Sequence, residues 1–435
     1  EIGVFCPVIA PSAVKDVSQN MISGYQLAPS QTYFTVYSDE DSAHPHPYRV
    51  ESGSLNYLQI KNLLTSFGHN TSLFTPAESF HALDNSLSNT NGVDVIIIAG
   101  SGQPTLGQII ELTLTTLGGN TVKFKDQRNI NGDGTVPLLS ASITDPHKNI
   151  FLNGPAEVFY SNQKHERLVF DGPALDLVKN ILMGSNDLPS GVSKTPYKII
   201  GHELSVHSPI NIHVYDSSGN HTGPTADGFE ANIPGSSYDT LGDAKFIYLP
   251  DNGIYNVKFE ATDDGSFDFK IRKFENDQNS ETILYKEIPL TDSTKAETTF
   301  DTSSNQPPTI HIDENGDGTS DFNAEKFSIL EGNANYDYTP PTISFDVNPK
   351  TIWPPNDKMV DVNITGHITD ENPYLMRILV DDEYDSVEPS VTIQNQTDIN
   401  QAIKLEASRK EDDKDGRKYT IKTLATDSAG NTSLA

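Results

Sequence analysis

The sequence predicts a multidomain protein in which an α/β segment is followed by all-β sandwiches. At 435 residues the chain is too long for one ordinary hydrophobic core, so several domains in series are expected. The hydrophobic pattern also changes along the chain, from mixed helix and strand patterns to strict alternation. Hydrophobic residues make up only 35% of the chain, which favours short strands and turns over long helices.

Residues 1–188 form the predicted α/β segment. Its clearest strand is Val93–Ile98, a continuous apolar run of the kind that is buried on both faces of a parallel sheet. Residues 54–67 and 171–183 have apolar side chains at helical spacing, and Asp171 is the expected N-cap of the second helix. Helices flanking a parallel sheet are therefore expected here.

Residues 189–305 are predicted to form a β-sandwich module. Polar and apolar residues alternate in Ile210–Tyr215 and in Tyr255–Glu260, with turn sequences between such runs. The next stretch, residues 306–338, opens with a Pro-Pro pair and is interpreted as a linker.

Residues 339–435 are predicted to form an immunoglobulin-like β-sandwich. Met359–Thr365 and Arg417–Thr423 have the composition of half-buried strands. Residues 427–433 read as a turn that leads into a strand cut off by the end of the chain. The chain starts without Met, so we expect truncation at both ends, with the N-terminal signal for export missing.

Composition argues against a nucleic-acid partner, an intrachain disulfide and a membrane span. Lys plus Arg number 30 against 60 Asp plus Glu, a net charge of -30, so nucleic acid is not an expected partner. Solubility is the simplest reading of this charge. Cys6 is the one cysteine, which rules out an intrachain disulfide. No apolar run approaches the roughly 18 residues of a membrane span.

Asp133 is the first candidate catalytic residue. It lies between Gly132 and Gly134 in a tight turn some distance beyond the predicted buried strand. A serine hydrolase needs a carboxylate fixed at a strand end to hold a histidine ring in one tautomer, and flanking glycines permit the required backbone. The alternative is an ordinary Asx turn or a Ca²⁺-binding turn, because such sequences are common in turn-rich proteins.

His165 is the candidate base. It follows Asp133 in the chain and precedes the helix predicted over 171–183, so acid and base occur in the order found in α/β-hydrolases. His147 is the second candidate for this role. His44 and His46 resemble a metal-binding pair, but no third ligand is evident, and a rigid polar loop is the preferred interpretation.

Four segments within residues 1–185 resemble the lecithin:cholesterol acyltransferase-like lipases of the α/β-hydrolase superfamily. Residues 20–30 are similar to a family stretch of the type RNMPSAYxLLPS, and residues 98–105 to its YGTGxPT strand end. Residues 132–140 resemble its acid turn, GDGTVPLxS, and residues 165–182 its closing helix. The resemblance implies a partial α/β-hydrolase fold, Asp133 as triad acid and His165 as base.

The sequence departs from this family at the nucleophile. No Gly-x-Ser-x-Gly occurs, because Gly100-Ser101-Gly102 lacks the outer glycines. The chain alone is therefore expected to be inactive. The resemblance implies a parent enzyme that hydrolyses or transfers acyl groups of lipids or other esters, and requires no cofactor for catalysis.

A second candidate site binds a metal ion. Residues 313–321 fit the spacing of a calcium loop, with Gly318 at the bend. The chelating Glu of the full motif is missing, since Ala324 occupies its position. A structural Ca²⁺ site is preferred over a solvated acidic linker, and its expected ligands are Asp313, Asn315, Asp317, Thr319 and Asp321.

Two functional hypotheses follow. The first is a fragment of an extracellular or cell-surface lipase, esterase or O-acyltransferase, because the β-modules resemble those of secreted prokaryotic hydrolases and imply a spacer or attachment role. The second is a non-catalytic adhesion or binding protein with a degenerate hydrolase region. A Gly-x-Ser-x-Gly motif in upstream sequence would distinguish them.

Overall fold

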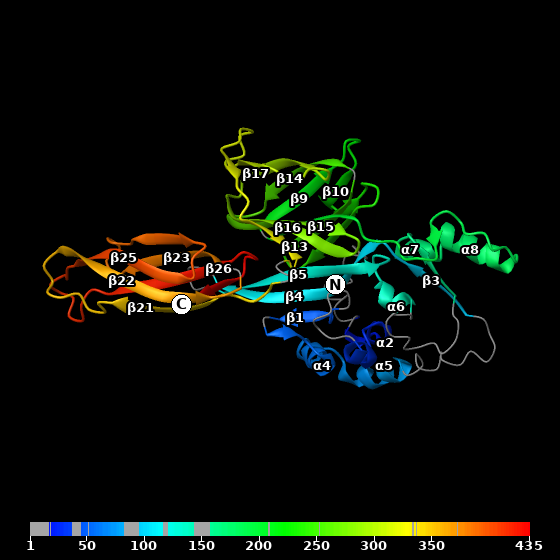
Figure 1. Ribbon diagram of the computed structural model, residues 1–435, viewed down its shortest axis with the longest axis horizontal. Coiled ribbons are helices and arrows are strands. Elements are labelled where there is room, and N and C mark those ends of the chain that lie inside the picture. Colours follow the sequence, from blue (N-terminus) through cyan, green and yellow to red (C-terminus); the bar gives the residue numbers. More distant parts are fainter. Residues whose placement is uncertain are drawn as a thin grey trace. The chain divides into compact units, whose positions relative to one another are not determined.

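The computed structural model is mostly β, with several sheets, as the alternating sequence predicts (Figure 1). It describes residues 17, 19–36, 45–50, 52–81, 95–115, 121–142, 157–207, 209–251, 253–332, 335, 337–371 and 373–435. The chain divides into two compact units. The first comprises residues 1–111, 125–280 and 287–324, and the second comprises residues 112–124, 281–286 and 325–435.

The N-terminal part of the first unit combines short helices with a small sheet. The helices are α2 (Ile22–Gln26), α3 (Gln31–Val36), α4 (Tyr57–Ser66), η2 (Thr71–Leu73) and α5 (Phe74–His81). Helix α4 starts where the periodic pattern predicts a helix, and Asn56 and Gln59 form a capping box at its N-terminus. The sheet has the order β2-β1-β4-β5, with strands β1 (Tyr48–Val50), β2 (Gly53–Ser54), β4 (Gln103–Thr115) and β5 (Thr121–Gly132).

A separate sheet contains the predicted parallel strand. Strand β3 (Ile96–Gly100) pairs in parallel with β6 (Glu157–Ser161), and β7 (Val192–Ser193) adds an antiparallel edge. The first two residues of the predicted strand, Val93 and Asp94, lie outside the described residues. The helices of this region are α6 (Leu138–Ser142), α7 (His165–Leu168) and α8 (Pro173–Leu182).

Helix α8 confirms the predicted helix but not its predicted N-cap. The cap is Gly172, with φ +81°, and Asp171 makes no capping hydrogen bond. Instead the Gln163 side chain accepts a 2.9 Å hydrogen bond from the Ala174 backbone N–H and donates one to the Asp171 carbonyl. A tertiary contact therefore replaces the local cap that the sequence suggested.

The central part of the first unit contains two antiparallel sheets. Residue bounds of the first, in spatial order, are β11 (Gly228–Ala231), β10 (His221–Thr225), β9 (Ile210–Tyr215), β14 (Ile254–Ala261), β17 (Lys295–Asp301), β18 (Ile310–Asp313) and β19 (Phe322–Ala324). The second contains β12 (Ser237–Leu241), β13 (Ala244–Pro250), β8 (Gly201–His207), β15 (Gly265–Glu275) and β16 (Gln278–Leu290). Strands β9 and β14 confirm the two alternating runs predicted there.

These two sheets pack face to face. The ring of Phe259 on β14 lies 5.7 Å from that of Phe267 and 5.0 Å from that of Phe269, both on β15. The alternation of side chains between the two faces of a strand explains the packing. Every second residue of β14 is buried against the other sheet, and the residues between them are exposed. Strand β8 differs, since six of its seven residues are buried, so both of its faces are covered.

Strands also occur within residues 306–338, which the sequence suggested to be a linker. Strands β18 and β19 form an antiparallel hairpin, and β18 pairs with β17. In the second unit, β20 (Ser328–Glu331) pairs with residues 281–284 of β16.

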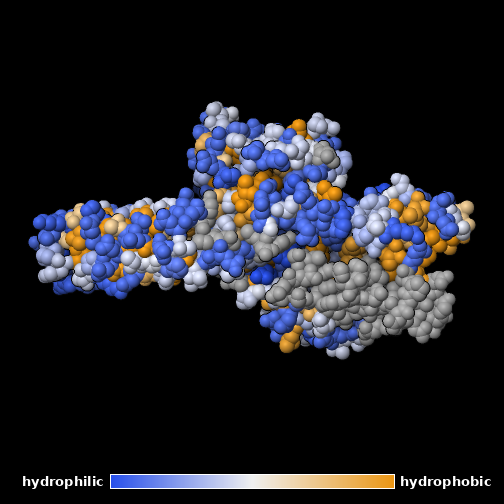
Figure 2. All heavy atoms as spheres, in the orientation of Figure 1, coloured by the Kyte–Doolittle hydropathy of each residue, from blue (hydrophilic) through white to orange (hydrophobic). Residues whose placement is uncertain are grey.

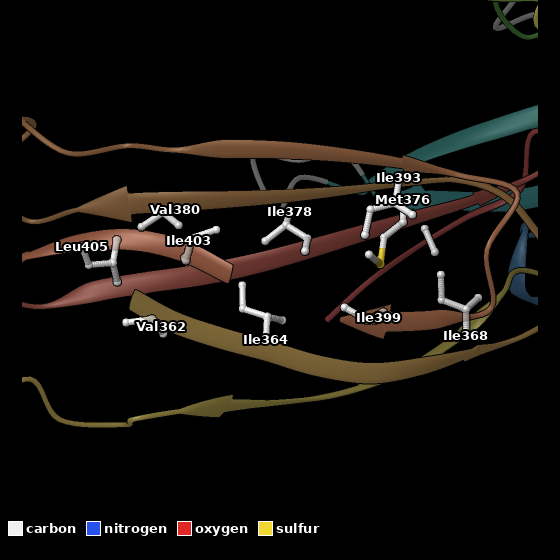
Figure 3. Close-up of a cluster of buried hydrophobic side chains, with 11 residues drawn as sticks. Val362, Ile364, Ile368, Met376, Ile378, Val380, Ile393, Ile399, Ile403 and Leu405 are labelled. Carbon is white, nitrogen blue, oxygen red and sulfur yellow. The ribbon is translucent and has the colours of Figure 1, made fainter. Parts of the chain in front are cut away.

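Residues 342–434 of the second unit form two sheets around one apolar core. Their orders are β21-β22-β25 and β24-β23-β26-β27. The bounds are β21 (Thr342–Asn348), β22 (Lys358–Thr369), β23 (Pro373–Asp382), β24 (Ser390–Gln394), β25 (Asp398–Ala407), β26 (Tyr419–Asp427) and β27 (Thr432–Leu434). Ile364, Ile378 and Ile403 lie at the centre of the core, where side chains from both sheets point toward one another (Figure 3).

Two details of this unit correct the sequence analysis. The range expected to be a turn, residues 427–433, already contains the start of strand β27 (Thr432–Leu434), which pairs antiparallel with β26. Strand β26 begins at Tyr419, two residues later than predicted, and Arg417 is buried in ion pairs with Asp382 and Glu406. No helix of the described residues has both the length and the apolar character needed to cross a membrane.

Candidate functional site

The Asp133 carboxylate is fixed by the turn that follows β5. One oxygen, Oδ1, accepts hydrogen bonds from the backbone N–H groups of Thr135 (2.9 Å) and Val136 (2.7 Å). The side chain is only 3% exposed. The carboxylate therefore has one oxygen bound within its own turn, and its second oxygen, Oδ2, is available to another group.

Two glycines make room for this turn. A Cβ atom on Gly100, at the end of β3, would lie 2.4 Å from the Cβ of Asp133. One on Gly132 would lie 2.4 Å from the hydroxyl oxygen of Thr105. That hydroxyl accepts a 2.9 Å hydrogen bond from the Gly134 N–H, so the close approach of β4 to the turn serves to hold it.

His165 meets the free oxygen of Asp133. Its Nδ1 lies 2.9 Å from Asp133 Oδ2, and its backbone N–H donates a 2.9 Å hydrogen bond to the Asp133 carbonyl. The sequence analysis expected a loop histidine, but His165 is the first residue of the one-turn helix α7. Asp133 in the turn after β5 and His165 at the start of α7 are thus brought together, as the sequence analysis paired them.

The two partners differ sharply in exposure. The Asp133 side chain is 3% exposed, whereas that of His165 is 49% exposed. Among the described residues, Asp133 is the one side chain that hydrogen-bonds to the His165 ring. A buried carboxylate that holds Nδ1 leaves Nε2 as the nitrogen with which the histidine can take or give a proton.

Exposed apolar side chains lie just after α7 and at the end of α8. Val169, Phe170, Leu182 and Met183 are 84%, 74%, 82% and 74% exposed, respectively. Figure 2 shows this hydrophobic surface over the segment from α7 to α8. Only Ala174 and Leu177 of α8 are buried, so one face of the helix packs inward and much of the rest is exposed and apolar.

Ser101 is not a nucleophile in this arrangement. It is fully buried, and its hydroxyl accepts a 3.0 Å hydrogen bond from the Tyr197 N–H. Its backbone N–H donates to the Ser161 carbonyl and continues the pairing of β3 with β6. Its role is therefore structural, in agreement with the lack of the outer glycines in the sequence.

Of the other candidate histidines, one is described. His147 and His44 lie outside the described residues. His46 is 7% exposed, and its ring lies 4.9 Å from that of Phe34. His46 is therefore a buried residue packed against an aromatic ring, and the polar loop that the sequence analysis preferred stays a prediction.

The candidate calcium loop joins β18 to β19. The Asp313 carboxylate accepts hydrogen bonds from the N–H groups of Asp317 (3.1 Å) and Gly318 (2.8 Å), and Gly318 has φ +90°, as expected at the bend. Asp321 Oδ2 accepts one from the Glu314 N–H. Asn315 and Thr319 lie in the same loop, where the Asn315 side chain also accepts from Asp317 N–H.

A different acidic group was missed by sequence reasoning. Among the described residues, Asp337, Asp370 and Asp427 bring carboxylate oxygens within 4.8 Å of one another, and Asp313, Asp317 and Asp321 form no such group. Asp427 is fully buried, and burial raises its pKa to about 7. The three residues are up to 90 positions apart, so no local motif in the sequence marks the cluster.

A buried charged network was also missed. On the covered face of the second sandwich sheet, Arg272 contacts Glu203 (2.7 Å) and Asp126, and Lys270 contacts Asp126 at 2.9 Å. Burial of Asp126 disfavours its charge, but these two cations outweigh it and hold the pKa of Asp126 well below its usual range. Polar residues at alternate positions of β8 and β15 normally indicate a solvent-exposed face, so the sequence pattern did not reveal this network.

The chain matches no known protein-family model. It also matches no curated protein at a significant level of similarity.

Proposed function

We propose that the chain carries the acid and base of a serine-dependent lipase, esterase or O-acyltransferase, on part of an α/β-hydrolase fold. The observation that supports this most strongly is the 2.9 Å contact between His165 Nδ1 and the buried Asp133 Oδ2. Since no Gly-x-Ser-x-Gly occurs in the sequence, the nucleophilic serine is supplied by residues outside these 435.

The proton transfers follow from this geometry. Asp133 accepts the Nδ1–H bond and holds the ring so that Nε2 takes the serine proton while the oxygen attacks the ester carbon. The imidazolium that forms is stabilised by the buried carboxylate. It then gives the proton to the departing alkoxide, which leaves as an alcohol, and water or an acceptor alcohol repeats the sequence on the acyl-enzyme.

The substrate proposed is a lipid or another acyl ester. Val169 and Phe170 follow His165 closely in the chain, and Leu182 and Met183 lie at the end of α8. All four are exposed, which suits contact with hydrocarbon. Acyl transfer and hydrolysis differ only in the acceptor. Catalysis of this type needs no cofactor.

The β-modules are proposed to act outside the cell. In this proposal the enzyme is extracellular or at the cell surface, and the immunoglobulin-like module of residues 339–435 attaches it there. The loop of residues 313–321 is proposed to bind a structural Ca²⁺, because its side chains provide oxygen ligands and the Gly318 bend is already formed.

A non-catalytic surface protein is the second candidate. The observation in its favour is that the sequence contains an acid and a base but no nucleophile motif. In this case the β-modules are the working part and the Asp133–His165 pair is a remnant.

The deciding experiment restores the upstream coding sequence and assays the product on short- and long-chain p-nitrophenyl esters. Asp133→Asn and His165→Ala are each expected to lower kcat by about 10³- to 10⁴-fold, while the present chain alone stays inactive. His367→Ala is the matched control, since His367 lies at the same 2.9 Å from a carboxylate, that of Asp398, but both are exposed. An inactive product, or activity indifferent to both changes, would favour the surface protein.

A further inference from the structure

Polar side chains of residues 126–131 bind the C-terminal half of β5 to the sandwich. Near the middle of β5, Gln127 and Asn129 donate to the buried carboxylate of Glu203 on β8, and Asp126 contacts Arg272 on β15. Successive residues of a strand alternate between faces, so Gln127, Asn129 and Asn131 share one face. This face leads directly to the turn that contains Asp133.

Asn131 is the last of these contacts before the candidate acid. Its Oδ1 accepts a 2.7 Å hydrogen bond from the Gly102 N–H, at the start of β4. Its Nδ2 donates to the Tyr197 carbonyl (2.7 Å) and to Asp277 Oδ1 (2.9 Å). Asn131 thus uses both ends of its amide to join β5, the β3–β4 turn and the sandwich, two residues before Asp133.

Asp277 provides the anchor within the sandwich. It lies in the β15–β16 turn with φ +74°, and the same Oδ1 that binds Asn131 accepts a 2.8 Å hydrogen bond from the Ile199 N–H. Its Oδ2 pairs with Lys198 at 2.6 Å. A carboxylate held by three groups fixes the position of the Asn131 amide.

The candidate base has a connection of its own. Lys164, the residue before His165, donates a 2.9 Å hydrogen bond from its ammonium group to the carbonyl of Ser236. Ser236 is buried at the start of the β12 hairpin of the sandwich. Acid and base are therefore each tied to the sandwich by a neighbouring residue, and not only to each other.

We propose that the β-sandwich module positions Asp133 and His165, with Asn131 and Asp277 as positioning residues. The module is then part of the machinery that holds the acid and base, and not the spacer that its sequence suggested. The inference rests on the proposed function only where it calls this pair catalytic. Positioning of this kind requires geometry held within about 0.5 Å, which supporting hydrogen bonds supply.

The proposal is tested by measuring which ring nitrogen of His165 carries the proton. This can be done on these 435 residues alone. Selective ¹⁵N-histidine labelling and NMR at alkaline pH distinguish protonated from unprotonated ring nitrogens. His165→Gln identifies the signals of His165. The unaltered chain is expected to carry the proton mainly on Nδ1, the nitrogen that faces Asp133.

Asn131→Ala and Asp277→Ala are expected to lower the population of this tautomer by about threefold or more, because the acid turn loses its support. Asp277→Asn is expected to preserve it, since an amide oxygen still accepts from Asn131. Lys198→Ala, which removes only the ion pair with Asp277, is expected to have little effect.

Phe259→Leu controls for general loss of stability, because it weakens the sandwich core without touching either contact. An unchanged tautomer in both alanine variants overturns the proposal. So does an equal change in Phe259→Leu. Absence of the Nδ1–H tautomer in the unaltered chain would instead contradict the Asp133–His165 pair and the proposed function itself.

Discussion

The space around Asp133 is small enough that one methyl group should displace it. Gly100→Ala would place a Cβ atom 2.4 Å from the Cβ of Asp133. We expect the acid turn to move, the Nδ1–H tautomer of His165 to be lost, and stability to fall by about 1–3 kcal/mol. NMR of the His165 ring and urea unfolding measure the two effects.

Gly184→Ala is the control for this change. Gly184 has φ +72° and open space at the Cβ position, so alanine adds only backbone strain of about 1–2 kcal/mol. It should leave the His165 tautomer unaltered. If Gly100→Ala also leaves it unaltered, Asp133 is less confined than the glycine contact indicates.

Deprotonation of the buried Asp427 carboxyl group should make the second unit less stable as pH rises from about 4 to 7. Burial raises its folded pKa to about 7 from the usual 3.8, so across this range the folded state binds more protons than the unfolded state. Stability then falls with pH, by on the order of 4 kcal/mol for a shift of about three units. Unfolding monitored from pH 4 to pH 8 in a chelator measures this slope.

Asp427→Asn is the matched variant, because an amide does not titrate. It should flatten the pH dependence of the second unit over this range. Asp361→Asn, a change at an exposed carboxylate, should leave the slope in place. A slope that survives Asp427→Asn would assign the titration to another group.

Local sequence signals predicted individual residues only where local contacts decide the structure. The glycine turn identified Asp133 as fixed, and the resemblance paired it with His165. The predicted N-cap Asp171 was wrong because Gln163 binds the start of α8 from outside the helix. The proximity of Asp337 and Asp370 to Asp427 depends on the tertiary arrangement of distant segments, which sequence spacing does not encode.

At the scale of elements, the buried face between β5 and the sandwich should be sensitive to single charges. Lys270→Met removes one of two cations beside the buried Asp126, and we expect a loss of about 3 kcal/mol, since a buried charge loses a partner. The Lys270 and Asp126 side chains are 13% and 1% exposed. Chemical denaturation of the variant measures the loss.

Lys404→Met provides the same substitution at an exposed site. Lys404 pairs with Asp361 at 2.8 Å, close to the 2.9 Å of the buried pair, but the side chains are 65% and 63% exposed. The expected loss is at most about 1 kcal/mol. Similar losses in both variants would mean that water reaches the Asp126 network.

The alternating pattern predicted strands such as β9 and β14, but it did not predict the contacts made by the outer face of a strand. The alternation of polar and apolar residues predicted β9 and β14, because one face of each strand packs in the core and the other is more exposed. Strand β8 does not follow this rule, since Glu203 and Ser205 are buried against a further layer. A polar residue on the outer face of a strand normally indicates solvent, so the docking of β5 was not visible in the pattern.

At the scale of the whole molecule, composition predicted a mostly β protein correctly, and the change of pattern near residue 188 suggested a boundary there. The first unit nevertheless extends across that position, because it includes residues 125–280. Hydrogen bonds such as Asn131 to Asp277 join residues 146 positions apart. The unity of such a region depends on long-range polar contacts, whereas linkers are recognised by local composition.

The net charge of -30 should make stability depend on salt. Mutual repulsion opposes the compact state, and raising NaCl from about 10 to 150 mM shortens the screening length from about 30 to 8 Å. We expect Tm at pH 8 to rise by about 2–5 °C, measured by scanning calorimetry. At acidic pH, where protonation of Asp and Glu removes much of the net charge, the same salt step should have little effect. A fall in Tm at pH 8 would mean that attractive pairs such as Lys404–Asp361, and not repulsion, dominate the surface electrostatics.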